Sequence, residues 1–581
     1  MVKRVMKFKE IVDEQGQVRK IQTQHAGKFL MAIPELNKGA AFTEQEREQF
    51  GLIGKLPTQV ETLNDQVSRY YAQYQAIETN LEKNNFLNRL KQHNNTAFYR
   101  LVMDNLKEML PIVYTPTIGD AVEKHSFQFD LPRGLTFSYL NKGHLDEVMN
   151  SLSYPEVELI IVTDGEGVLG IGDWGVGGID ICVGKLMVYT LCAGINPRRV
   201  LPIQIDVGTN NSALLDDPMY LGWRHPRIEG ADYDAFIDEV VAAITKKFPD
   251  VYLHWEDFGR ENARKNLNRF RDKMCTFNDD MQGTGATAAA SVMSAVKSID
   301  QSITEQRIVI FGAGTAGAGI ADQLCNAMQQ QGLTEQQAQQ RIWLVDRPGL
   351  LIDTMDDLLF FQQPYARSHL ELLNWELAEG EAPGLLEVVN AVHPTVLIGC
   401  STVKGAFSEE IVKAMASAVA RPIIFPLSNP TSKAEATPSD LMLWTSGQVI
   451  IATGSPFAPV PFQDKMIRIS QCNNAFVFPG LGLGVLSAKA SRVTDAMIAA
   501  AADALSNCSP ALKEKNAPVL PDFDQIHEVS LRIALAVAEQ ARLDGVARVE
   551  QHVDLATRCQ SLFWMPEYVE YERVDAMPPE A

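Results

Sequence analysis

The sequence has few positive charges, few cysteines and no long apolar run. Its 52 basic residues are outnumbered by 72 acidic residues, which gives a formal net charge of -20 at pH 7. A surface of that sign repels phosphate backbones and anionic lipid headgroups, so neither a nucleic acid nor a membrane is expected as a partner. A small anionic substrate would then need a local cation or metal ion to hold it.

The eight cysteines are scattered, form no Cys-x-x-Cys pair and are too few for a disulfide scaffold. Residues 1–15 lack the apolar segment of a secretory signal, and no stretch approaches the roughly eighteen apolar residues of a membrane span. The sequence therefore predicts a soluble, cytoplasmic protein. Its 46% hydrophobic content excludes a disordered chain, and its 581 residues predict three or four domains.

The spacing of apolar residues changes along the chain. From about Thr43 to Met109 they recur at helical spacing, and the motif Thr43-Glu-Gln-Glu46 is typical of a helix start. After Pro155, short apolar runs alternate with helical stretches, which predicts an α/β fold of two domains with largely parallel sheets and with helices at both ends of the chain. The predicted strands are Leu159–Thr163, Val200–Ile205, Val251–Trp255 and then, from about Gly285, Arg307–Phe311, Ile342–Val345, Thr395–Gly399, Pro422–Phe425 and Val449–Ala452.

A glycine motif follows the first strand of the second block. Gly312, Gly314 and Gly317 have G-x-G-x-x-G spacing and lead into a predicted helix, where the backbone could approach the pyrophosphate of a dinucleotide. The same spelling occurs at 165–170 and 170–175, but only the first motif is followed by a second strand that ends in an acid, Asp346. Asp346 is therefore expected to accept hydrogen bonds from the adenosine ribose.

Asp346 also bears on the choice of dinucleotide. The 34 residues from Gly312 to Asp346 exceed the roughly twenty typical of the motif, which a longer intervening helix explains. A carboxylate repels a 2′-phosphate and favours NAD, although Arg347 beside it could receive that phosphate in NADP. NAD is the predicted cofactor.

Two pairs of acids lie where α/β folds bind ligands. Glu256 and Asp257 follow an apolar strand, and Asp279 and Asp280 precede an alanine-rich helix. Four carboxylates with no thiolate nearby, and with only His254 beside them, would suit Mg²⁺ or Mn²⁺ rather than zinc. The alternative is that each acid caps a helix or lies in a solvated turn.

Lys185 is the one ammonium in a segment, 181–192, that is apolar on every face. Burial lowers the pKa of a lysine and can make it a base, whereas a lysine that reaches the surface or forms a structural ion pair has no such role. Tyr114, just before a turn, is a candidate proton donor, although a tyrosine in that place is often merely packed.

Several short motifs from one end of the chain to the other point to a single family. They are Ile112-Val-Tyr114-Thr-Pro-Thr117, Val162-Thr-Asp-Gly165, Val183-Gly-Lys185-Leu186, Glu256-Asp257-Phe258, Phe277-Asn-Asp-Asp280, Leu427-Ser-Asn429-Pro-Thr431 and Cys472-Asn-Asn474-Ala-Phe476. Together they resemble the malic enzyme family. The resemblance implies oxidative decarboxylation of (S)-malate to pyruvate, CO₂ and NADH.

The resemblance also implies domains and roles. It implies a helical N-terminal region (1–130), a malate- and metal-binding α/β domain (131–283), a Rossmann-type NAD-binding domain (284–470), a final part that returns to the catalytic domain and ends in a helical tail (471–581), and a homo-oligomer, either dimer or tetramer. The implied site residues are Glu256, Asp257 and Asp280 as metal ligands, Lys185 as general base, Tyr114 as the acid that protonates the enol, and Asn429 and Asn474 as contacts to substrate and nicotinamide.

One position departs from the family pattern. Malic enzymes usually have Asp-Gly-Glu-Arg where this chain has Asp164-Gly-Glu-Gly167, and that arginine holds the substrate carboxylate. Gly167 and the run 253–259 resemble instead the malolactic enzymes, which convert malate to lactate and CO₂ with NAD kept bound. Residues 452–457 and Phe563-Trp564 resemble the bacterial NAD-malic enzymes, so malic enzyme is the preferred hypothesis, with Arg133 or Arg224 as a substitute for the missing arginine.

Two further alternatives follow from the same motifs. An inactive metabolite-binding or regulatory protein is suggested by the missing arginine but disfavoured because every acid, base and metal position is retained. Decarboxylation of oxaloacetate would use the same metal and Tyr114 without hydride transfer, as a side activity.

Overall fold

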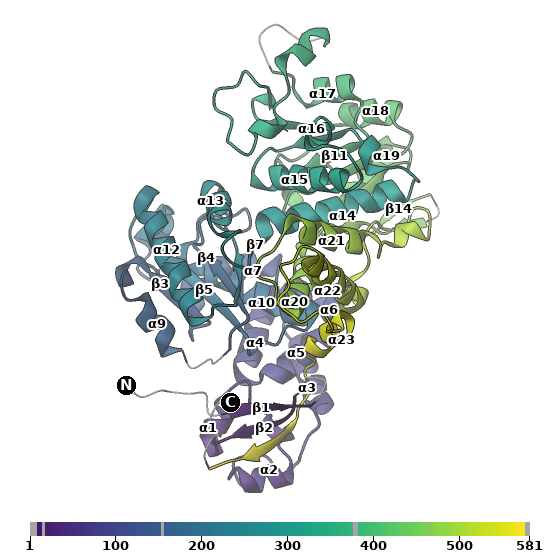
Figure 1. The fold of residues 1–581 in the computed structure, drawn as a ribbon. Coiled ribbons are helices and arrows are strands. Elements are labelled where there is room, and N and C mark those ends of the chain that lie inside the picture. The colour runs from purple at the N-terminus through teal and green to yellow at the C-terminus, as the bar shows by residue number, and fades with distance from the viewer. Residues whose placement is uncertain (1–7, 14–17, 153–155, 376–381, 464, 576–581) are drawn as a thin grey trace. The chain divides into compact units, whose positions relative to one another are not determined.

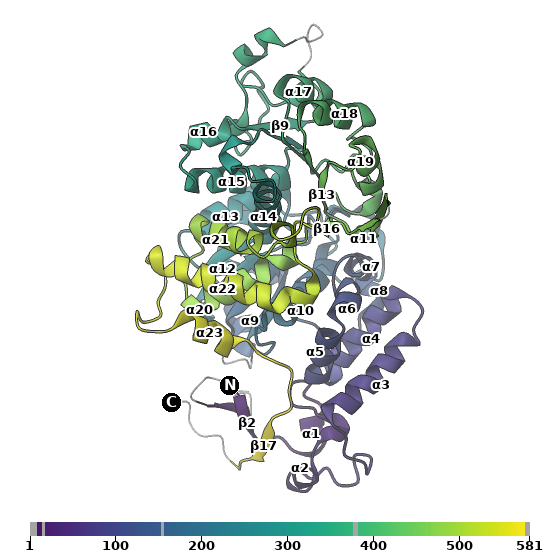
Figure 2. The same cartoon turned by 90° about the vertical axis from the view of Figure 1, so that its right-hand side faces the viewer.

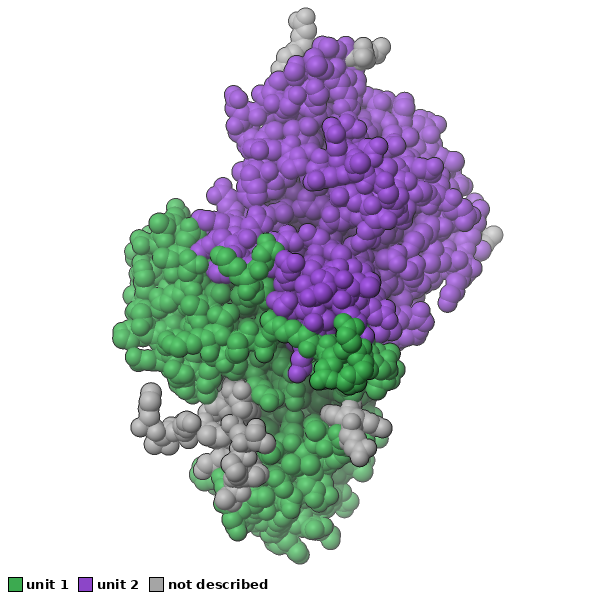
Figure 3. Space-filling view, viewed as in Figure 1, with its two compact units in different colours: residues 1–259, 272–276, 548–581 green, residues 260–271, 277–547 purple. Residues whose placement is uncertain are grey.

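The structure is a computed structural model that divides into two compact units, each described by itself (Figure 3). Part of the segment that lacks a secretory signal, residues 1–7 and 14–15, lies outside the described residues. Unit 1 comprises Met1–Gly259, Asp272–Thr276 and Arg548–Ala581, and unit 2 comprises Arg260–Arg271 and Phe277–Ala547. The described residues are 8–13, 18–152, 156–375, 382–463 and 465–575.

A parallel sheet forms the centre of unit 1 (Figure 1). β5 (Val200–Asp206) lies between β3 (Leu135–Ser138) and β4 (Leu159–Thr163), and β4 also pairs with β6 (Tyr252–Trp255). Every residue of β4 and β6 is buried, as expected for strands covered on both faces. The prediction of a parallel α/β sheet from the apolar runs is confirmed, and β3 is an additional strand.

Helix α10 (Ile179–Ala193) is buried over its whole length. It contacts β4 and β5 as well as α5 (Asn95–Asp104), α6 (Leu106–Val113) and α7 (Thr117–Glu123), which explains why it is apolar on every face. By length and hydropathy Gly175–Ala193 could cross a membrane, so the expectation that no stretch approaches a span is wrong by that measure. All of this segment is nevertheless buried inside the protein, as is typical of a core helix.

The N-terminal region is mostly helical, as predicted, and its longer helices lie together in Figure 2. The expected helix start is present: Glu46 N donates to the Thr43 hydroxyl at 3.2 Å, and Thr43 N donates to the Glu46 carboxylate at 3.0 Å. This reciprocal pair satisfies backbone donors that the first helical turn leaves open. The helices are α2 (Glu44–Gln49), α3 (Leu63–Gln75) and α4 (Asn80–His93).

The same region also contains a small sheet that the apolar spacing did not predict. β1 (Phe8–Val12) pairs with β2 (Val18–Thr23), and β2 pairs in parallel with β17 (Glu570–Arg573) from the other end of the chain (Figure 1). Tyr571 of β17 joins a buried cluster there, and the Lys38 ammonium lies 3.9 Å from the centre of its ring. Local patterns do not reveal a pairing between the two ends of a chain.

A seven-stranded sheet forms the centre of unit 2, with the order β10-β9-β8-β11-β12-β13-β16. All neighbours pair in parallel except β10 (Gly349–Leu350), which runs antiparallel to β9. The strand order reverses at β8, which makes the carboxyl end of β8 a topological switch point where such sheets bind ligands. The five predicted strands of this block are confirmed as β8 (Ile308–Phe311), β9 (Ile342–Asp346), β11 (Val396–Gly399), β12 (Ile423–Pro426) and β13 (Ile450–Thr453), and β16 (Ser470–Gln471) is added.

Helices complete unit 2 towards the C-terminus. α20 (Phe478–Ala488), α21 (Asp495–Ser506) and α22 (Ile526–Leu543) pack together (Figure 2). A Cβ atom on Gly480 or Gly484 would lie within 2.8 Å of backbone oxygens of α22, so these glycines permit the close approach of the two helices.

Candidate active site

A chain of hydrogen bonds runs through the core of unit 1 between α10 and the end of β6. Lys185 Nζ donates to Glu256 Oε1 at 2.5 Å, and His254 Nε2 lies 2.8 Å from Glu256 Oε2. His254 Nδ1 lies 2.8 Å from the hydroxyl of Tyr189. None of these four residues is more than 2% exposed. Lys185 therefore does not reach the surface. It is hydrogen-bonded to Glu256, which the family resemblance implies as a metal ligand.

The helical and strand periodicities of the sequence place the members of this hydrogen-bond chain next to one another. Lys185 and Tyr189 are four residues apart on α10 and lie on one face of that helix. His254 and Glu256 are two residues apart at the end of β6 and point to one side of the sheet, since Glu256 N still bonds to Val162 O at 2.9 Å. Sequence reasoning did not identify Tyr189 and treated His254 only as a neighbour. Polar residues at these spacings within apolar elements were the available signal.

The Asp257 loop explains the glycine at the departing position. Asp257 has a positive φ of 53°, and its backbone oxygen accepts from Gly167 N at 3.0 Å. Its carboxylate accepts from Leu169 N at 3.2 Å. A Cβ atom on Gly167 would lie 2.8 Å from the backbone oxygen of Phe258, so any side chain there requires this backbone to move. Glycine thus allows the 165–170 loop to lie directly against Asp257.

Tyr114 lies at the break between two helices. It ends α6, is 6% exposed, and precedes a cis peptide bond between Thr115 and Pro116. Its ring would be 3.3 Å from a Cβ atom on Gly184, so the absence of a side chain on Gly184 admits the phenol against α10. The ring therefore contacts the helix at the residue next to Lys185.

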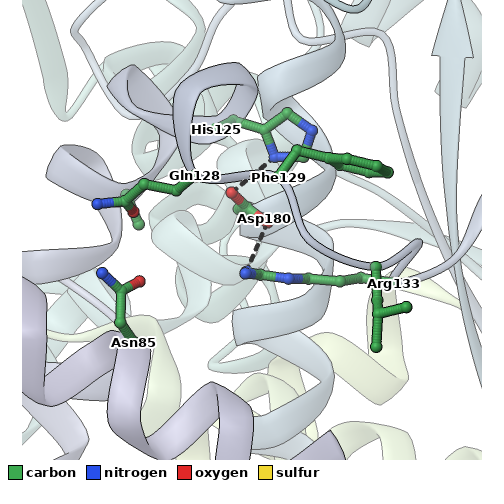
Figure 4. A pocket seen from close by; sticks show the side chains of 8 residues that line it. Asn85, His125, Gln128, Phe129, Arg133 and Asp180 are labelled. Carbon is green, nitrogen blue, oxygen red and sulfur yellow. Dashed lines mark hydrogen bonds and ion pairs between the residues drawn. The ribbon is translucent and has the colours of Figure 1, made fainter.

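Both arginines proposed as substitutes for the missing clamp have protein partners. Arg133 Nη1 donates to Asp180 Oδ1 at 3.0 Å, and His125 Nδ1 lies 2.9 Å from the other oxygen of the same carboxylate (Figure 4). Arg224 donates to the backbone oxygen of Pro218 at 2.5 Å. A substrate carboxylate would have to compete with Asp180 for Arg133.

Arg227 is a third cation, one that the sequence analysis did not identify. Its Nε and Nη2 donate to the two oxygens of Asp173, each at 2.7 Å, and Nη2 also donates to Asp164 O at 2.9 Å. Burial alone would raise the pKa of Asp173, but the hydrogen bonds and charge of Arg227, together with hydrogen bonds from Asn210 N and the Thr209 hydroxyl, outweigh it and hold that pKa below its usual value. For Asp164, burial dominates and raises the pKa despite Arg227. This buried network ties together the two ends of the loop that contains Gly167.

The glycine motif of unit 2 forms a tight turn at the carboxyl end of β8. Gly312 has φ +106°, and a Cβ atom there would lie 2.5 Å from the backbone of Cys400. A Cβ atom on Gly317 would lie 1.9 Å from Gly312 O, whereas Gly314 meets nothing closer than 4.0 Å. Thr315, directly after Gly314, begins α15 (Thr315–Gln330). Its Oγ1 is buried without a hydrogen-bond partner among the described residues. A half-buried helix start with such a donor fits a pyrophosphate.

Two other predicted cofactor residues lie at strand ends of the same sheet. Asp346 is the last residue of β9, and its Oδ1 accepts from Arg347 N at 2.9 Å. Asn429 follows β12, and its amide oxygen accepts from the Ser455 hydroxyl at 2.5 Å. All of these strands present their carboxyl ends at one edge of the sheet, the edge where dinucleotides bind.

The second acidic pair opens a π-helical turn, Asp279–Gly283, in unit 2. Asn474 Nδ2 donates at 2.9 Å both to Asp279 Oδ2 and to the Thr284 hydroxyl. The amide hydrogens of Asn474 thus hold the turn that carries Asp280, and a contact to substrate would have to use its amide oxygen.

The carboxylates fit the divalent ion that the sequence predicts. Glu256 and Asp257 are adjacent, at most 4% exposed, and supply oxygen donors only, which suits Mg²⁺ or Mn²⁺. The nitrogens that contact Glu256, Lys185 Nζ and His254 Nε2, are both engaged in hydrogen bonds with its carboxylate. No thiolate lies in this donor set, so the chemistry of the residues disfavours zinc.

Comparisons with known proteins agree with this architecture. Residues 91–271 match the family model of the malic enzyme N-terminal domain, and residues 281–542 match that of the malic enzyme NAD-binding domain. The chain is 47% identical over 555 residues to a protein of Pseudomonas aeruginosa named NAD-dependent malic enzyme, covering 96% of this chain and 98% of that protein. It is 46% identical, with the same coverage, to a protein of that name from Pectobacterium carotovorum.

Solved structures show the same fold. The malic enzyme of Entamoeba histolytica has a TM-score of 0.54 at 21% identity, covering 88% of this chain and 89% of that one. The malic enzyme of Pyrococcus horikoshii has a TM-score of 0.53 at 24% identity, covering 78% and 89%.

Proposed function

This chain belongs to the malic enzyme family, and on that premise we propose that it catalyses the oxidative decarboxylation of (S)-malate. The products are pyruvate, CO₂ and NADH, and the cofactors are NAD and a divalent ion, Mg²⁺ or Mn²⁺. The observation that carries the proposal is the 47% identity to an NAD-dependent malic enzyme over 96% of the chain. The buried pair of Lys185 and Glu256 supports it, because it joins the proposed base to a proposed metal ligand.

Glu256, Asp257 and Asp280 are the proposed ligands of the divalent ion, and Gly312, Gly314, Gly317, Asp346 and Asn429 are the proposed NAD contacts. When bound, the ion supplies positive charge that polarises the malate hydroxyl and stabilises the enolate, and NAD accepts the hydride. The protein has a net charge of -20 and needs a local cation to hold an anionic substrate, and the same ion would supply that cation.

Lys185 and Tyr114 are the proposed proton carriers. In its neutral amine form, Lys185 Nζ takes the proton of the malate C2 hydroxyl while the hydride leaves C2, which forms the ketone and the Lys185 ammonium. The bond between C3 and the carboxylate that becomes CO₂ then breaks to leave the enolate, and the Tyr114 hydroxyl donates its proton to C3 of the enolate to give pyruvate. Asn429 and Asn474 are the proposed substrate contacts, Asn474 through its amide oxygen.

The substrate carboxylate needs a cation in place of the family arginine. Arg133 and Arg224 remain the proposed substitutes, and Arg133 has the side-chain partner, Asp180, that would have to release it. We expect Arg133→Gln to raise the KM for malate about tenfold or more, since a bidentate partner contributes a few kcal/mol. An unchanged KM would exclude Arg133 from this role.

The test is a product assay of the purified chain with (S)-malate, Mn²⁺ and NAD. Equal amounts of NADH and pyruvate are expected. Lactate without net NADH would instead identify a malolactic enzyme, the outcome that Gly167 alone would favour and that the names of the curated relatives do not. An equal rate with NADP would contradict the role proposed for Asp346 in selecting NAD.

We also propose the four-part division at residues 130, 283 and 470, a homodimer or homotetramer, and a cytoplasmic location. Limited proteolysis with mass spectrometry tests the division, and light scattering measures the assembly. A monomeric mass at micromolar concentration would contradict the proposed oligomer.

A further inference from the structure

The hydrogen-bond chain of unit 1 extends beyond the residues with a proposed catalytic role. Glu256 uses Oε1 for Lys185 and Oε2 for His254, so both oxygens of one proposed metal ligand are engaged by protein groups. Each carboxylate oxygen offers two lone-pair directions. The two hydrogen bonds therefore fix the plane of the carboxylate.

The partners on the far side of the ring determine how His254 is protonated. An ionised carboxylate only accepts hydrogen bonds, so His254 must donate from Nε2 to Glu256. In a neutral imidazole, Nδ1 is then an acceptor, and the Tyr189 hydroxyl, 2.8 Å away, is placed to donate to it. Tyr189 thus selects the tautomer that His254 needs in order to hold Glu256.

Packing prevents the ring from taking another orientation. His254 and Tyr189 are both fully buried, and their rings meet edge to face, with centres 5.8 Å apart and planes at 82°. His254 lies within β6, whose neighbour β4 pairs with it along its length. A rotation of the imidazole would break two buried hydrogen bonds at once. The packing of the folded core therefore fixes the orientation of the Glu256 carboxylate.

We infer that His254, oriented by Tyr189, is a positioning residue that holds the Glu256 carboxylate ready for the divalent ion. The inference rests on the function proposed above. Removing a group that orients a metal ligand in this way typically lowers metal affinity by about 10- to 100-fold.

The experiment measures Mn²⁺ binding by the full chain from the electron paramagnetic resonance signal of free Mn²⁺, with neither malate nor NAD present. His254→Ala is expected to weaken binding about 10- to 100-fold. His254→Gln, whose amide can still donate to Glu256, is expected to recover most of the affinity, and Tyr189→Phe to lose less than His254→Ala. At high Mn²⁺ the turnover of His254→Ala should rise towards that of the unmodified chain.

His125→Ala is the matched control, since His125 also bonds to a carboxylate in unit 1, but to one outside the proposed metal site (Figure 4). It should leave Mn²⁺ affinity unchanged. A folded His254→Ala or Tyr189→Phe variant that binds Mn²⁺ as tightly as the unmodified chain would overturn the inference and leave the proposed function intact. If His254→Ala does not fold, the affinities of His254→Gln and Tyr189→Phe decide. Failure of the unmodified chain to bind Mn²⁺ would instead contradict the proposed function itself.

Discussion

The two candidate sites are built from different materials. In unit 2 the nucleotide site is made of backbone: Gly312 and Gly317 allow a turn so tight that a Cβ atom would lie within 2.5 Å of another backbone atom. In unit 1 the catalytic site is made of side chains, with Lys185, Glu256 and His254 joined through the core. At Gly312 and Gly317 the turn has no room for an added atom, whereas a buried polar network tolerates no missing partner.

The largest effect is expected where a partner is removed from unit 1. Lys185→Ala should lower kcat by about 10²- to 10⁴-fold, because it removes the proposed base. It should also destabilise the fold by about 3–5 kcal/mol, since Glu256 is left buried without its cation. Assays of NADH formation and chemical denaturation measure the two effects.

A double variant separates these two consequences. Lys185→Ala combined with Glu256→Gln removes the unpaired charge and should regain part of the stability but none of the activity. Normal turnover by Lys185→Ala would contradict the assignment of the base.

The second effect tests the backbone site by adding one methyl group. Gly317→Ala places a Cβ atom 1.9 Å from Gly312 O and should weaken NAD binding at least about tenfold and lower stability by about 1–3 kcal/mol. Gly314→Ala, three residues earlier in the same glycine motif, meets nothing closer than 4.0 Å and is the matched control for stability. Calorimetric titration with NAD compares them, and equal stability of the two variants would show that the turn yields more readily than its geometry implies.

A third prediction applies the same steric argument to a glycine of unit 1. Gly167→Arg restores the residue usual in the family, yet its Cβ atom would lie 2.8 Å from Phe258 O. We expect a loss of about 1–3 kcal/mol in stability and no gain in malate affinity, because the loop must move away from Asp257. A lower KM for malate in this variant would show that the loop accommodates the arginine. Packing would then not be the reason for glycine at position 167, and a functional reason would remain.

The smallest effect concerns pH and the pair of acids around Arg227. The pKa of folded Asp173 lies below 3.8, so its contribution to stability is present above that pH and is lost as pH falls through the lowered folded value. The pKa of folded Asp164 lies above 3.8, so its contribution is present below 3.8 and is lost as pH rises through the raised value. Urea unfolding between pH 3 and 7 should give opposite pH trends for Asp173→Asn and Asp164→Asn relative to the unmodified chain, and parallel trends would contradict this assignment.

The elements of the candidate nucleotide site could be predicted because their signals are local. A strand, three glycines, a helix and a following strand that ends in Asp346 are consecutive in sequence, and each was found where it was predicted. Thr315 escaped notice because a hydroxyl in a glycine motif has no spacing of its own. The sheet of β1, β2 and β17 escaped for the opposite reason, since its strands come from the two ends of the chain.

The candidate catalytic site of unit 1 could be predicted only as separate residues. Lys185, Glu256 and Asp257 were identified by their types and by their apolar surroundings, and Tyr114 by its motif. Their mutual contacts, the role of His254 and Tyr189, and the engagement of Arg133 by Asp180 depend on distances between segments far apart in the chain. Sequence also could not say why position 167 is glycine.

By itself, the sequence determined the α/β class, the parallel sheets, the nucleotide turn and the family, because hydrophobic periodicity and glycine spacing act over a few neighbouring residues. Only the tertiary structure decided which charges pair. A buried charge needs a partner, and the fold decides which residue supplies it. The pairs here are Lys185 with Glu256, Asp180 with Arg133 and Asp173 with Arg227, and no local pattern connects the segments that they join.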